Sequence, residues 1–126
     1  MKTSQKLSQE FVQQTHFAIA CYARCDPLFD DAKTHLTGAV RKMLQRPLEF
    51  KKHSKDDRTI AYLIMDACSH LNDRELNLEV NAFFENVIEK AARQELDLED
   101  LYCFMDIADR GFCKVETLLP LLKKRL

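Results

Sequence analysis

The sequence contains few of the residues that make tight turns, because its 126 residues include two glycines and three prolines. A protein built from β-sheets needs many tight turns and uses glycine and proline to form them. The scarcity of both residues therefore favours long helices joined by a small number of connections.

Long apolar segments are also missing. No apolar run approaches the length that crosses a membrane, and residues 1–14 contain no apolar stretch of signal-peptide length. The cysteines are five, an odd number, and most of them fall within apolar patterns, as small core residues do. These features suit a reducing compartment, and we expect a cytoplasmic protein that does not bind membranes.

Motifs for common enzyme chemistries are absent as well. The sequence has no glycine-rich phosphate loop, no paired-carboxylate motif and no HExxH zinc motif. Its densest catalytic-type cluster is Ser69 and His70 with Asp66 or Asp73, at a predicted helix end, where the helix dipole alone favours a histidine. We expect no catalytic residues. The alternative, an enzyme built from Ser69, His70 and Asp66, requires a cleft that brings the three together.

Apolar residues recur at steps of three and four, which predicts an all-α protein. We expect a single helical domain spanning residues 1–126, a compact bundle of about six helices with short connections. The predicted helices cover residues 4–24, 27–45, 57–71, 72–93, 97–110 and 115–124. Residues 72–93 have the widest apolar stripe and are therefore predicted to form the central helix. This stripe comprises Leu76, Val80, Phe83, Phe84, Val87, Ile88 and Ala91.

Several residues predict local features of these helices. Gly38 lies in the middle of the second helix, which suggests that another backbone passes close by. Gly111 is placed to end the fifth helix in a left-handed conformation. Pro120 is tolerable if the last helix begins close to it, with Thr117 as its cap. The predicted buried face of the fifth helix comprises Leu98, Leu101, Tyr102, Met105 and Ala108.

The segment 101–118, LYCFMDIADRGFCKVETL, resembles the EF-hand family in its order of apolar helix, aspartate, glycine and second helix. With Asp106 as the first ligand, the glycine of the loop falls on Gly111, as the family requires. The third, fifth and twelfth positions are Ala108, Arg110 and Thr117, which supply no calcium carboxylate. We therefore expect a plain helix–turn–helix corner here, without a bound metal.

Two cysteines, Cys21 and Cys25, lie one helical turn apart with His16 nearby. They could provide two corners of a zinc tetrahedron, but a closed site needs four ligands and no second pair at ligand spacing occurs. Buried free thiols are the preferred interpretation, and we expect no cofactor.

The net charge of −1 hides an asymmetry along the chain. Residues 1–58 hold 11 lysines and arginines against 7 acidic residues, whereas residues 66–116 hold 5 against 13. The acidic residues are densest at 95–109. Such a face attracts basic partners and repels nucleic acid. Its predicted partner-binding residues are Glu95, Asp97, Glu99, Asp100, Tyr102, Asp106 and Asp109.

The sequence thus predicts a non-catalytic, protein-binding module, monomeric or weakly dimeric. An acidic helical surface suits an immunity or antitoxin-type inhibitor that covers a basic toxic enzyme, such as a nuclease. Its partner is then a basic protein, such as a toxin domain, rather than nucleic acid. The alternative is a small regulatory adaptor with a degenerate EF-hand-like corner, which binds a partner helix in an apolar groove.

Overall fold

The computed structural model describes residues 9–24, 32–50 and 55–125. These residues form six α-helices and no β-strand, which confirms the all-α prediction for the described part of the chain. The predicted starts of the first two helices lie outside the described residues, and so does Cys25. The helices are α1 Gln9–Ala23, α2 Ala32–Leu44, α3 Lys55–Leu71, α4 Arg74–Ala91, α5 Leu98–Asp109 and α6 Val115–Arg125.

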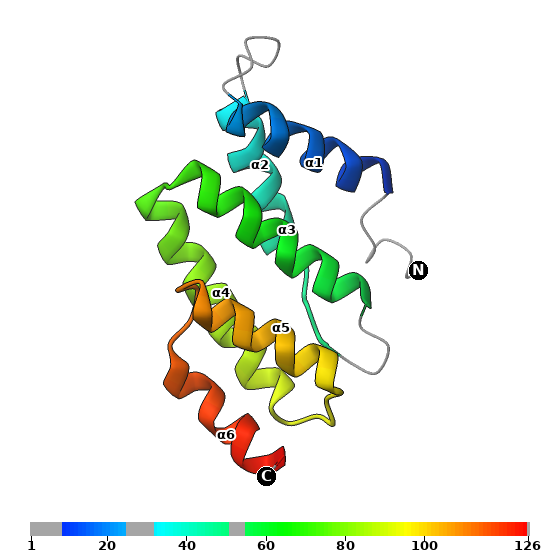
Figure 1. The fold of residues 1–126 in the computed structure, drawn as a ribbon, viewed down its shortest axis with the longest axis vertical. Helices are drawn as coiled ribbons and strands as arrows, with labels where there is room; N and C mark the ends of the chain where they lie inside the picture. Colours follow the sequence, from blue (N-terminus) through cyan, green and yellow to red (C-terminus); the bar gives the residue numbers. More distant parts are fainter. Residues whose placement is uncertain (1–8, 25–31, 51–54, 126) are drawn as a thin grey trace.

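The third helix, rather than the fourth, occupies the middle of the fold. Figure 1 shows α1 and α2 at one end of the molecule, α5 and α6 at the other, and α3 between them. Helix α3 packs against α1, α2, α4 and α5, whereas α4 packs against α2, α3 and α6. The prediction that 72–93 forms the central helix was therefore wrong, although α4 buries the predicted stripe apart from Phe83, which is half-buried. Width of an apolar stripe measures how much of a helix is covered, not how many helices cover it.

Short polar side chains set the starts of α4 and α5. The Asp73 carboxylate accepts a hydrogen bond from the Leu76 amide at 3.0 Å, and the Asp97 carboxylate accepts one from the Asp100 amide at 2.9 Å. Each satisfies an N–H group that the first helical turn leaves without a partner. Gly111 has φ +85°, which confirms the predicted left-handed helix end.

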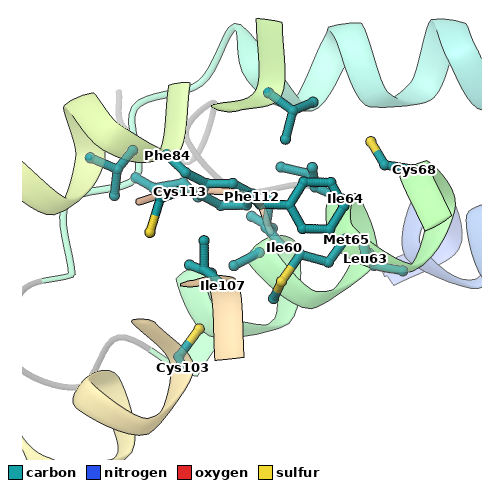
Figure 2. Close-up of a cluster of buried hydrophobic side chains, with 14 of the residues drawn as sticks. Ile60, Leu63, Ile64, Met65, Cys68, Phe84, Cys103, Ile107, Phe112 and Cys113 are labelled. Carbon is teal, nitrogen blue, oxygen red and sulfur yellow. The ribbon is translucent and has the colours of Figure 1, made fainter. Parts of the chain in front are cut away.

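The core between α3, α4 and α5 is continuous and rich in phenylalanine. Figure 2 shows Phe84 and Phe112 within this cluster of buried side chains. The centroids of the two rings are 6.4 Å apart. Phe50 meets Phe104 edge to face at 4.7 Å. Burying each such ring stabilises the fold by about 1.5–3 kcal/mol.

Two local predictions were wrong. A Cβ added at Gly38 would meet no atom within 4 Å, so no other backbone among the described residues passes close to this glycine. Thr117 lies inside α6 rather than capping it, since the helix begins at Val115 and contains Pro120.

No helix in the described ranges combines the length and the apolar character that a membrane span needs.

Candidate functional site

Three of the seven predicted partner-binding residues are held by one arginine. Arg58 of α3 contacts Asp100 at 2.8 Å, Glu99 at 3.5 Å and Asp97 at 3.9 Å. The Asp100 side chain is 2% exposed and that of Arg58 is 18% exposed, so solvent barely reaches their contact. This hydrogen bond raises the pKa of Arg58. The cluster fastens the N-terminal end of α5 to the first turns of α3.

Burial removes Asp100 from any docking surface, which corrects its assignment as a partner-binding residue. Asp97 also has a structural task, because it caps α5. The Glu99 side chain is 73% exposed and that of Asp97 is 51% exposed, although both contact Arg58. A partner can therefore reach Glu99, but it cannot reach Asp100 without opening the fold.

Asp106 is tied to α3 through Tyr62. The Tyr62 hydroxyl donates to the Asp106 carboxylate at 2.5 Å, and the Arg110 guanidinium lies 5.7 Å from the Tyr62 ring centroid. Burial, followed by the hydrogen bond to Asp106, raises the pKa of Tyr62. Arg110 in turn pairs with Asp66 at 3.0 Å. The EF-hand-like corner is thus held by hydrogen bonds between α3 and the end of α5, and the first carboxylate of the loop is already engaged.

The remaining predicted residues, Glu95, Tyr102 and Asp109, are exposed. Tyr102 is 59% exposed and has two large apolar neighbours on the same side of α5, Leu98 at 52% and Met105 at 45%. The prediction that Leu98, Tyr102 and Met105 face the core was wrong. Instead, α5 buries Asp100, Leu101, Cys103, Phe104 and Ile107.

These exposed side chains form a line along the helix. Residues four, three and four apart lie on one helical face, so Leu98, Tyr102, Met105 and Asp109 follow one another along the outside of α5. We call these four residues the α5 ridge. Glu99 lies next to the ridge, one residue from Leu98. The ridge therefore has an apolar body and carboxylates at its edge, a composition typical of surfaces that bind proteins.

The signal for this ridge was present in the sequence but ambiguous. Two stripes can be drawn on α5, one through Leu98, Tyr102 and Met105 and another through Leu101, Phe104 and Ile107. Both have helical spacing. The second is buried because it carries the side chains that face α3 and α6, the helices on which α5 packs.

The alternative catalytic cluster is engaged in other contacts. The Ser69 hydroxyl donates to the Asp66 backbone carbonyl at 2.9 Å, while the Asp66 carboxylate pairs with Arg110. His70 is exposed at the end of α3. A nucleophile relay needs a hydroxyl hydrogen-bonded to a base and that base hydrogen-bonded to a carboxylate, whereas Ser69 contacts a backbone carbonyl and Asp66 contacts an arginine.

Cys21, Cys68, Cys103 and Cys113 are buried and free. Burial raises the pKa of Cys68 and of Cys103 to about 12, and that of Cys113 to about 11. Thiolates are the reactive and metal-binding form, so these three groups are poorly suited to either role near neutral pH. The described residues contain no cluster of three or more side chains suited to hold a metal ion.

The described surface has hollows, of which two are well formed. One, of about 420 Å³, lies between the segment 44–49 and α4, and the other, of about 520 Å³, lies where the ends of α3 and α5 meet α4. Polar side chains dominate the second, among them Ser69, Asn72, Asn77 and Arg110.

Comparisons with known protein families, curated proteins and solved structures found no match to this chain.

Proposed function

We propose that this chain is a non-catalytic, cytoplasmic protein-binding module and that the α5 ridge docks on a basic, amphipathic helix of a partner protein. The observation that carries the proposal is the outward exposure of Leu98, Tyr102 and Met105 in one line. Large apolar side chains at this spacing can interdigitate with the apolar side chains of an opposing helix. Burying them on binding supplies affinity, and Tyr102 provides a rigid aromatic anchor.

Charge favours a basic partner over a second copy of this chain. Glu99 and Asp109 are exposed beside the apolar body of the ridge. Two copies joined through the ridge would bring these carboxylates together, whereas lysines or arginines of a partner would complement them. The same carboxylates oppose the phosphates of nucleic acid.

An immunity or antitoxin-type inhibitor is the particular role that we propose for this surface. In that role the ridge covers a basic helix of a toxic enzyme, such as a nuclease, and blocks access of its substrate. Arg58 already engages Asp97, Glu99 and Asp100, so the ridge, rather than a broad acidic face, supplies most of the contacts to the partner. Glu95 contributes to the long-range attraction because it is exposed just before α5.

The test is a titration followed by the amide signals of the isotopically labelled chain in NMR spectra. The probe is a synthetic amphipathic helix of leucine and lysine, and its control has glutamate in place of lysine. We expect the lysine peptide to shift signals of residues 98–109 and the glutamate peptide to leave them in place. Shifts that centre on other helices would contradict the proposal.

Matched variants test which residues of the ridge contribute to peptide binding in this titration. The double variant Tyr102→Ser/Met105→Ser should bind the lysine peptide about tenfold or more weakly than wild type does, because anchor residues carry most of the binding free energy. Leu78→Ser is the control, since Leu78 is 65% exposed and belongs to α4 rather than to the ridge. Asp109→Lys should weaken binding at low salt and have less effect at high salt. The alternative, a regulatory adaptor, instead predicts that a partner helix binds in an apolar groove and that added salt does not change the affinity.

A further inference from the structure

A hollow of about 420 Å³ lies between the segment that follows α2 and one side of α4. Its apolar walls are Leu44, Pro47 and Leu48 from the first side, and Phe83 and Val87 from the second. Its volume falls in the range of sites that hold small molecules. The hollow is separate from the α5 ridge, since none of its lining residues belongs to α5.

The wall formed by residues 47–49, together with the adjoining Phe50, is fixed from two directions. One carboxylate oxygen of Asp57 accepts hydrogen bonds from the amides of Glu49 and Phe50, at 3.1 and 3.0 Å. The Gln94 side-chain amide donates to the Glu49 carbonyl at 2.7 Å. These contacts hold the hollow open without a ligand, so little ordering free energy opposes binding.

Phe50 shows that the surrounding fold enforces this wall. Its φ is +50°, a left-handed conformation that is strained for a bulky side chain. The ring is fully buried against Phe104, which keeps the backbone in place. Strained backbone of this kind persists where neighbouring contacts determine it, and it occurs often beside binding sites.

Two cations line the hollow. Arg46 and Lys90 lie on opposite sides, one after α2 and the other on α4. The Arg46 Nε atom is buried and has no hydrogen-bond acceptor among the described residues. A buried N–H without an acceptor is unfavourable, and a bound anion that rearranges the Arg46 guanidinium can relieve this. Asn86 adds a further polar group at the rim.

We propose that this hollow binds a small monocarboxylate with an apolar body. Its carboxylate contacts Arg46 and Lys90, and its body packs on Leu48, Phe83 and Val87. Glu49 also lines the hollow, so the local charge is close to +1 and suits a monoanion better than a polyphosphate. Both a free aliphatic acid and a peptide ending in an apolar residue with its free carboxylate have this chemistry.

The experiment is an NMR titration of the full chain with sodium octanoate, with 1-octanol as the uncharged control. We expect octanoate at millimolar concentration to shift the amide signals of residues 44–49 and 83–94, and 1-octanol to bind at least tenfold more weakly. Equal binding of the two would overturn the proposal, because the cations would then contribute nothing. Absence of shifts at these residues would overturn it as well.

Variants separate charge recognition from stability. Lys90→Gln should weaken octanoate binding about threefold to tenfold without harming the fold, since Lys90 is exposed. Arg46→Gln should weaken it about tenfold, and Arg46→Lys should restore part of the loss. Arg93→Gln is the control, because Arg93 is an exposed cation of the same region that does not line the hollow. Unchanged binding in both Lys90→Gln and Arg46→Gln would overturn the proposal.

A second pair of probes identifies the source of the carboxylate. N-acetyl-Leu-Leu with a free carboxylate is compared with the same dipeptide as its amide. Tighter binding of the free dipeptide than of octanoate assigns the hollow to peptide ends, and the reverse order assigns it to free acids. If the amide binds as well as the free dipeptide, the carboxylate is not recognised and the proposal fails.

Discussion

Helix α5 has two faces that carry similar residues and serve different purposes. On the inner face, Asp100 is buried against Arg58 and Phe104 packs in the core. On the outer face, Asp109 and Tyr102 are exposed. Carboxylates and aromatic rings occur on both, so residue type does not distinguish them. The surroundings of each residue distinguish them, since α5 packs on α3 and α6 through its inner face, whereas Leu98, Tyr102 and Met105 on its outer face are exposed.

Within one run of acidic residues, some carboxylates stabilise the fold while others remain in solvent. A carboxylate that is desolvated beside an arginine is costly to disturb, because removal of either partner leaves a buried charge without compensation. A carboxylate in water is free to act at long range.

The largest effect is expected at Arg58. Arg58→Met removes the charge that faces Asp100 while keeping much of the side-chain volume, and it should lower the free energy of unfolding by about 3 kcal/mol. Denaturant unfolding of the variant measures this loss. Adding Asp100→Leu should recover much of it, because the buried carboxylate is then gone.

Arg41→Met provides the matched control for that measurement. Arg41 pairs with Glu79 at 3.0 Å, and both side chains are about half exposed. Surface ion pairs contribute little, so this variant should unfold at nearly the wild-type denaturant concentration. An equal loss in the two variants would contradict the structural role assigned to the Asp100 contact.

The second effect concerns pH and the buried thiols. Burial raises the pKa of Cys68 and Cys103 from 9.0 to about 12, so the unfolded chain releases these protons first as pH rises. The contribution of these two thiols to the free energy of unfolding is therefore fully present below pH 9 and declines as pH rises from about 9 towards 12. The loss at pH 10 should be about 1 kcal/mol for each thiol. Urea unfolding at pH 8 and pH 10 measures it, and Cys103→Ala should show a shallower decline.

A third, smaller effect is expected for the hydrogen bond between Tyr62 and Asp106. Tyr62→Phe should lower the free energy of unfolding by about 1 kcal/mol, because a bond to a carboxylate is lost and the half-buried Asp106 can partly rehydrate. Thermal unfolding measures this. Tyr102→Phe is the control and should be neutral, since its hydroxyl is on the exposed face.

The smallest effect on stability is expected on the ridge. Leu98→Ser, Tyr102→Ser and Met105→Ser should each change the free energy of unfolding by about 0.5 kcal/mol or less, because these side chains are already exposed. The same denaturant curves measure the change. A loss comparable with that of Arg58→Met would show that the ridge is packed in solution and would remove it as a docking surface.

Much of the fold could be predicted from the sequence. The helix starts predicted at residues 72 and 97 lie within one residue of the observed caps Asp73 and Asp97, and the predicted end at Gly111 has the expected left-handed backbone. Local rules for helix ends are enough for these predictions. The central position of α3 could not be predicted, because it depends on which helices meet. The burial of Asp100 depends in the same way on Arg58, 42 residues earlier in the chain.

The candidate site was predicted in region but not in detail. The segment 95–109 was selected for its charge, and the structure retains Tyr102 and Asp109 on an exposed face. Helical spacing predicts that Leu98 and Met105 are buried, but it cannot say which of two apolar stripes is covered. The buried stripe is known once the packing of α5 on α3 and α6 is known.

Affinity capture tests the central claim, that the outer face of α5 binds a basic partner, most directly. The wild-type chain, the triple variant Leu98→Ser/Tyr102→Ser/Met105→Ser and the control Leu78→Ser are immobilised and exposed to extracts of the cells that produce the chain. We predict that wild type and Leu78→Ser retain the same basic protein at low salt and that the folded triple variant does not. Retention of that protein by the triple variant would contradict the claim.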